Sequence, residues 1–139
     1  MLYEDHVVDA VCLHLEAQGW RIETRAHAHQ HGDDIVAVRG AERLIVEAKG
    51  AGSSKEGTRR YGQAFNGGQV KTHVGVAVLR ALGVVSERTA LAAVAFPADV
   101  NHRSVAGRVV PALAAAGVGV FWVDDDHHVT AQLPWTSTS

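Results

Sequence analysis

The segment that most constrains the fold is residues 32–49, GDDIVAVRGAERLIVEAK, in which two short apolar runs flank a glycine-containing turn. Gly40 stands at the first central position of a two-residue loop, so the segment predicts an antiparallel β-hairpin. In the register that this loop sets, Asp34 faces Glu47. Like charges directly opposite each other destabilise a sheet. The acids at the open end of the hairpin therefore require a compensating partner.

A divalent cation between Asp34 and Glu47 would meet this requirement. Mg²⁺ prefers hard oxygen ligands and is usually held by one or two carboxylates together with water and substrate phosphate. Lys49 lies two residues beyond Glu47, so on a strand both side chains point to the same face. An ammonium group there can orient a metal-bound water or stabilise developing negative charge.

The alternative interpretation is an ordinary surface cluster in which Lys49 neutralises both acids. Val36 and Ile45 share the face of the acids in the expected register, and both apolar runs are uninterrupted. This pattern indicates that both faces of the hairpin are buried and that the charges lie at a covered edge. Charges left unpaired at such an edge would be costly, which favours a bound cation.

The rest of the chain predicts one α/β domain over residues 1–133, followed by a frayed tail at 134–139. A length of 139 residues, 47% of them apolar, gives room for one core. We expect a mixed central sheet flanked by helices. The expected elements beside the hairpin are a helix over 4–17, a strand over 20–24, a helix from Asn66, a strand over 91–96, a helix over 104–117 that Pro111 kinks or restarts, a strand over 118–123 and a second hairpin.

The start of the helix after the hairpin has its own signature. Asn66 is a good N-cap, Gln69 stands three residues later as in a capping box, and Phe65 with Val70 would form the hydrophobic staple. The buried stripe of this helix is expected to consist of Val70, Val74, Ala77 and Ala81.

Charge is distributed unevenly along the chain. From residue 49 to residue 80 there are six bases against one acid, a net +5, which leaves −7 elsewhere because the total is −2. Local positive charge attracts a phosphate backbone, so a nucleic-acid partner is compatible with the acidic total. A solvated basic loop without a partner remains the alternative.

The cellular compartment is indicated only indirectly. Cys12 is the single cysteine and cannot form an internal disulfide, which is typical of a reducing cytoplasm. The N-terminus is acidic where a secretory leader would be basic, and no apolar run approaches the roughly 20 residues that span a bilayer. We expect a cytoplasmic protein that does not enter the membrane.

GDDIVAV followed by LIVEAKG resembles the PD-(D/E)XK nuclease superfamily, with Asp34 as the first acid and Glu47-Ala48-Lys49 as the acid-x-lysine triplet. The likeness is nearest to archaeal Holliday-junction resolvases and Mrr-type endonucleases, which place a glutamate in the first helix, where Glu4 stands. Asp33 replaces the proline of the family name, and the resolvases' arginine-glycine pair before the helix glutamate is missing.

The resemblance implies a restriction endonuclease-like αβββαβ core and Mg²⁺-dependent hydrolysis of DNA phosphodiester bonds, with Mn²⁺ able to substitute. Asp34 and Glu47 would bind the metal with Glu4 or the backbone carbonyl of Ala48, and Lys49 would position the attacking water. A glutamine in the next helix would complete the site, with Gln69 favoured over Gln63. The DNA backbone would contact a basic region that comprises Ser53, Ser54, Lys55, Arg59, Arg60 and Lys71. No element reads bases, so sequence specificity is not predicted.

Three further hypotheses follow from the sequence. The chain could be a catalytically silent nucleic-acid-binding or assembly module on the same fold. It could be a zinc hydrolase, because His27, His29 and His31 would share one strand face. A homodimer is also expected, since cutting both strands commonly requires two copies, and Phe121 and Trp122 form its candidate interface.

Overall fold

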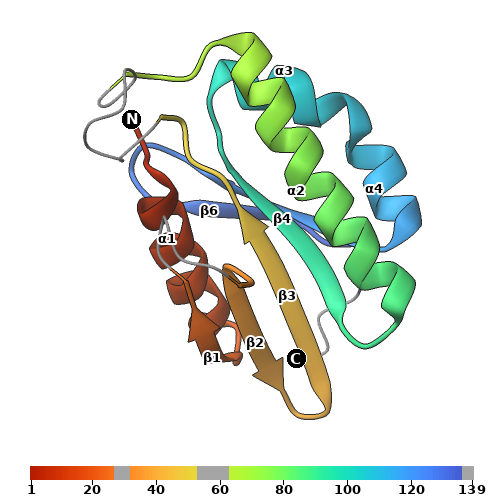
Figure 1. Ribbon diagram of the computed structural model, residues 1–139. Coiled ribbons are helices and arrows are strands. Elements are labelled where there is room, and N and C mark those ends of the chain that lie inside the picture. Colours follow the sequence, from red (N-terminus) through yellow and green to blue (C-terminus); the bar gives the residue numbers. More distant parts are fainter. Residues whose placement is uncertain (27–31, 53–62, 136–139) are drawn as a thin grey trace.

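The computed structural model describes residues 1–26, 32–52 and 63–135 (Figure 1). Its elements follow in the order α1 (Glu4–Ala17), β1 (Arg21–Arg25), β2 (Ile35–Arg39), β3 (Glu42–Ala48), α2 (Gly67–Glu87), β4 (Leu91–Pro97), α3 (Val100–Ala106), the 3-10 helix η1 (Gly107–Val109), α4 (Val110–Ala116), β5 (Val118–Val123) and β6 (Val129–Gln132). The predicted αβββαβ order, followed by a helical segment and a hairpin, is confirmed.

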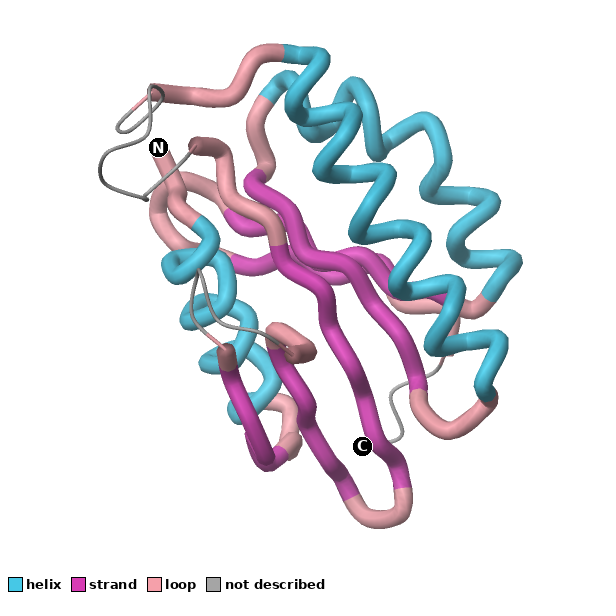
Figure 2. The backbone as a smooth tube through the Cα atoms, in the orientation of Figure 1, coloured by secondary structure: helices cyan, strands magenta, loops and turns pink. Residues whose placement is uncertain are grey.

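The strands form one mixed sheet in the order β1-β2-β3-β4-β5-β6 (Figure 2). β4 runs parallel to both β3 and β5, whereas the β1–β2, β2–β3 and β5–β6 pairs are antiparallel. α1 lies on one face of the sheet, and α2, α3 and α4 lie on the other (Figure 1). The expected fold class, an α/β domain with a mixed sheet between helices, is confirmed.

Alternate side chains of the central strands enter two separate cores, as strands covered on both faces require. Ala93 and Ala95 of β4 belong to the core under α1, whereas Val94 and Phe96 belong to the core under α2. Glu47 of β3 is the register partner of Val94, so its side chain points to the α2 face. That face therefore carries the acid of the predicted triplet.

The predicted register of the β2–β3 hairpin is confirmed. Val36 pairs with Ile45 and Arg39 pairs with Glu42, so the loop consists of Gly40 and one further residue. Gly40 has φ +59°, in the left-handed region that this turn requires and that favours glycine. The turn chemistry therefore sets which side chains meet at the far end of the hairpin.

The predicted start of α2 is also confirmed. The Asn66 side chain accepts a hydrogen bond from the Gln69 N–H at 2.9 Å, and the Gln69 side chain accepts one from the Asn66 N–H at 2.9 Å. This reciprocal capping box satisfies two of the N–H groups that every helix start leaves without a helical partner. The buried residues of α2 are those of the predicted stripe, Val70, Val74, Ala77 and Ala81.

The helical segment predicted over 104–117 is wrong in its start. α3 begins at Val100 because Asp99 caps it, accepting a hydrogen bond from the His102 N–H at 2.8 Å. The chain then tightens into η1, and α4 restarts with Pro111 in its first turn, where the missing N–H costs nothing. Of the two predicted effects of Pro111, a kink or a restart, the restart is observed.

The interface predicted through Phe121 and Trp122 is wrong. Phe121 is 1% exposed and Trp122 is 3% exposed, because β5 is covered on both faces. Phe121 belongs to the core under α1, and Trp122 belongs to the core under α2. Trp135, which the sequence analysis places in the tail, packs half-buried against the core under α1. A β-carbon at Gly119 would lie 2.8 Å from the Cη2 atom of its ring.

Candidate functional site

A cavity of about 600 Å³ opens beside the end of the β2–β3 hairpin. The first residue of α1, the segment before β2, the end of β3 and one side of α2 surround it. Four sequence-predicted site residues line the cavity, namely Glu4, Asp34, Glu47 and Lys49. The remaining lining residues are Gly32, Asp33, Ile45, Arg80, Gly83, Val84 and Glu87.

Asp34 and Glu47 form the buried centre of the site. Asp34 is 9% exposed and Glu47 is 3% exposed. The Asp34 Oδ2 atom accepts a hydrogen bond from the Ala48 N–H at 2.8 Å, so the carboxyl group is tied to the neighbouring strand. Ile35 is the register partner of Val46, so Asp34 and Glu47, one position further along, stand opposite each other at the end of the hairpin.

Burial raises the pKa of the acids in the cavity, because a carboxylate removed from water is costly. The pKa of Glu47 rises to about 7 through burial first and the nearby Asp34 second, while Arg80 acts in the opposite direction. The pKa of Glu4 also rises to about 7, again through burial and then Asp34. Burial raises the pKa of Asp34, against the hydrogen bond from Ala48 and the charge of Lys49.

Two bases line the cavity beside these acids, Lys49 and Arg80. Arg80 lies on α2 and makes an ion pair with Glu47, with 3.3 Å between Nη1 and Oε2. The charge of Lys49 holds the pKa of both Glu4 and Asp34 lower than burial alone would leave it. Lys49 therefore acts electrostatically on more than one of the carboxyl groups in the cavity.

Glu4 reaches the site because the start of α1 packs directly on the chain that follows β3. The Ala51 N–H donates a hydrogen bond to the Leu2 carbonyl at 2.7 Å. A β-carbon at Gly50 would lie 2.4 Å from the Glu4 nitrogen, a distance that only glycine avoids. Gly50 thus permits the close approach that brings an acid from α1 to the end of the hairpin.

The donor set fits a hard divalent cation. Asp34, directly before β2, and Glu47, on β3, offer carboxylate oxygens, and Mg²⁺ is usually held by one or two carboxylates with its other positions left to water and phosphate. A cation bound between them would remove the repulsion that burial and proximity create. Glu4, from a third element, could join through a water.

Titration of Glu47 should be visible in the stability of the metal-free protein. A carboxyl whose pKa is raised by folding stabilises the fold while protonated and loses that contribution as the pH rises through the folded pKa. For Glu47 the window runs from its ordinary value of 4.5 to about 7. In EDTA, we expect wild type to lose about 1 to 2 kcal/mol more unfolding free energy than Glu47→Gln between about pH 5 and pH 7.5, measured by urea unfolding. An equal loss in both proteins would contradict this assignment.

Other predicted site residues lie elsewhere. Gln69 caps α2 and is not among the cavity-lining residues, Gln63 is exposed before that helix, and Lys71 is exposed on its second turn. The remaining predicted DNA-contacting residues, Ser53, Ser54, Lys55, Arg59 and Arg60, and the predicted zinc ligands, His27, His29 and His31, lie outside the described residues.

Sequence reasoning missed Arg80 as a site residue and counted it only in the charge of its segment. A signal was present, since Arg80 stands three residues after Ala77 and one before Ala81, at the border of the predicted buried stripe. At such a border a long basic side chain can lay its apolar stem along the packed face of the helix and keep its charged end outside the core. Its pairing with Glu47 depends on how α2 lies over β3, which the local pattern does not give.

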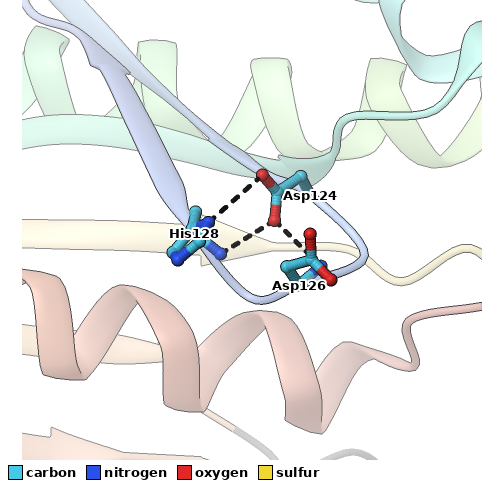
Figure 3. Close-up of side chains that lie close together, drawn as sticks. All are labelled: Asp124, Asp126 and His128. Carbon is cyan, nitrogen blue, oxygen red and sulfur yellow. Dashed lines mark hydrogen bonds and ion pairs between the residues drawn. The ribbon is translucent and has the colours of Figure 1, made fainter.

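A second group of possible ligands lies in the β5–β6 turn (Figure 3). Within the described ranges, Asp124, Asp126 and His128 are the one trio of such side chains with ligand atoms within 4.8 Å of one another. All three are exposed, and the Asp124 Oδ1 atom accepts hydrogen bonds from the Asp126 and His128 N–H groups at 2.9 Å each. These bonds close the turn and account for the arrangement without a metal.

Comparison with known proteins shows the fold. No family profile and no curated protein sequence matches the chain. The crystal structure of an FdxN element excision controlling factor protein from Anabaena variabilis is similar, with TM-score 0.51 and 16% identity over 94% of this chain and 99% of that one. SfsA from Pyrococcus furiosus, solved with Ca²⁺, aligns with TM-score 0.43 and 16% identity over 93% of this chain and 59% of that one. At these identities the likeness concerns architecture alone.

Among the described helices, none is both long enough and apolar enough to cross a membrane.

Proposed function

We propose that this protein is a divalent-metal-dependent nuclease that hydrolyses phosphodiester bonds in DNA. The observation that carries the proposal is the buried pair Asp34 and Glu47 at the wall of an open cavity that Lys49 also lines. Repelling acids at a covered strand end are costly for the fold, so their retention beside a base indicates a use for a cation.

Each residue has a distinct role in this proposal. Asp34 and Glu47 would hold Mg²⁺, or Mn²⁺ in its place, and Glu4 would support the site from α1. The bound metal would supply neutralising charge at the phosphate and a lowered pKa for a water molecule. The Ala48 N–H fixes the Asp34 carboxylate at 2.8 Å, so this ligand needs little rearrangement. Lys49 would orient the attacking water and stabilise charge that develops on the phosphate.

DNA is proposed as substrate because the segment from 49 to 80 carries a net +5 in an otherwise acidic chain. Contacts from such a segment to the phosphate backbone give affinity without sequence information. The name of the similar Anabaena protein refers to the control of the excision of an element. That likeness supports the fold, and the proposed chemistry depends on the cavity residues.

The test is cleavage of plasmid, linear and branched DNA in Mg²⁺, Mn²⁺ or EDTA. Asp34→Asn keeps the shape and the acceptor for the Ala48 N–H but removes the charge, and we expect it to lower the cleavage rate by more than about 10²-fold. Asp124→Asn is the matched control in the β5–β6 turn and should cleave like wild type.

Each outcome of this assay has a definite meaning. Metal-dependent cleavage that requires Asp34 supports the proposal. Cleavage lost in Asp124→Asn and kept in Asp34→Asn would move the metal to the turn. DNA binding without cleavage in either metal would favour the alternative, a nucleic-acid-binding module that no longer cuts.

A further inference from the structure

Arg80 is the guanidinium that α2 presents to the cavity, and its contact with Glu47 has a consequence for metal binding. We propose that Arg80 takes the place of the metal in the metal-free site and, once the metal binds, is released to hold a phosphate oxygen of the DNA. The inference rests on the proposed function, because it takes Asp34 and Glu47 as the metal ligands.

The ion pair joins a buried acid to an exposed base. The side chain of Glu47 is 4% exposed, whereas that of Arg80 is 58% exposed. Their contact, 3.3 Å between Arg80 Nη1 and Glu47 Oε2, is longer than the roughly 2.7–2.9 Å of a strong charge-assisted bond. Arg80 therefore neutralises Glu47 without a tight two-point clamp, and its side chain can leave while Glu47 stays in place.

Arg80 and a metal ion would compete for the same carboxylate. A ligand carboxylate must be deprotonated and accessible, and Arg80 occupies an oxygen of Glu47. After a dication binds, its charge repels the neighbouring guanidinium and removes the reason for the ion pair. The metal ion replaces the Arg80 guanidinium as the positive group beside Glu47. The buried carboxylate therefore has a positive partner in both states.

The cavity gives the released side chain a new partner. Gly83 lines the cavity one turn after Arg80 on α2, and a β-carbon added there would meet nothing within 4 Å, so the wall beside Arg80 is open. A substrate phosphate drawn to the metal would lie in that space. Arginine binds phosphate oxygens through its planar fork, a geometry that lysine lacks.

A purely structural Arg80 would behave differently. If Arg80 only held Glu47 in position, its removal would loosen a ligand and weaken metal binding. If Arg80 stands in for the metal, its removal frees the ligand and strengthens metal binding. The sign of the change in metal affinity separates the two roles without any measurement of cleavage.

The experiment compares wild type with Arg80→Met, Arg80→Lys and the charge control Arg108→Met, which removes an exposed base from η1. Calorimetric titration with Mn²⁺ is expected to show at least about threefold tighter binding in Arg80→Met. Binding of a DNA duplex is measured with Ca²⁺ and with EDTA. The DNA affinity of Arg80→Met should fall about tenfold in Ca²⁺ and change little in EDTA. Arg80→Lys should lose less DNA affinity than Arg80→Met. Arg108→Met should match wild type in Mn²⁺ affinity.

The outcomes separate this inference from the proposed function. Mn²⁺ binding by wild type but not by Glu47→Gln would support the metal site. If Arg80→Met then binds Mn²⁺ no more tightly than wild type, Arg80 does not take the place of the metal, and the metal site remains supported. Equal loss of DNA affinity in Ca²⁺ and EDTA would overturn the metal-triggered release. If wild type itself binds no Mn²⁺, both the inference and the proposed function fail.

Discussion

Replacing Lys49 by alanine is expected to slow Mg²⁺-dependent DNA cleavage by about 10²- to 10³-fold, comparable to the removal of one preorganised donor from an active site. Lys49 lines the cavity beside Asp34 and Glu47 and influences the pKa of Asp34, so its charge acts on the place where the reaction would occur. It is not a ligand, so Mn²⁺ affinity should stay within a few-fold of wild type. Single-turnover cleavage rates and Mn²⁺ titration check the two effects separately.

The matched control for Lys49→Ala is Arg108→Ala, which removes an exposed base outside the cavity. Lys49→Arg should recover only part of the rate, since it keeps the charge in a bulkier, planar group. Cleavage by Lys49→Ala at the wild-type rate would remove Lys49 from the mechanism, even if Asp34→Asn were inactive.

Replacing Gly50 by alanine is expected to cost about 2 to 3 kcal/mol of unfolding free energy, typical of an overpacked site. The added β-carbon would lie 2.4 Å from the Glu4 nitrogen and 2.8 Å from the Tyr3 carbonyl carbon. Both are backbone atoms, so relief requires movement of the start of α1 rather than of a flexible side chain. The melting temperature should fall by about 5 to 10 °C in thermal unfolding followed by circular dichroism.

Gly75→Ala provides the contrast. Gly75 lies on the exposed side of α2, and a β-carbon there meets nothing within 4 Å, so alanine should stabilise the protein by about 0.5 to 1 kcal/mol.

Gly50→Ala should also weaken Mn²⁺ binding, because Glu4 moves with the start of α1. Equal melting temperatures for Gly50→Ala and wild type would contradict the close packing described for α1.

Local chemistry explains the parts of the fold that were predictable. A two-residue loop with Gly40 admits few hairpin registers, and the alternation of a strand then determines which side chains share a face. The capping box of Asn66 and Gln69 spans four residues, so its start signal is complete within the sequence. The same signal explains why Gln69 serves the helix start rather than the cavity.

The start of α3 depends on a local signal, because Asp99 caps the helix by accepting a hydrogen bond from the His102 N–H within its own turn. The other features that differ from the predictions depend on contacts between distant parts of the chain. Trp135 looked like part of a polar tail, yet it packs on the core under α1. Phe121 is buried because helices cover both faces of the sheet at β5. The sequence shows only that the strand is apolar.

The sequence by itself determined the element order, the hairpin register and the meeting of Asp34 with Glu47, because each follows from local patterns and from counting outward from a four-residue turn. Tertiary structure alone decided that Glu4 reaches them across Gly50, that Arg80 pairs with Glu47, and that a cavity remains open beside them. These features arise from the docking of α1 and α2 onto the sheet. Docking is set by the packing of whole faces, which no short pattern in the chain encodes.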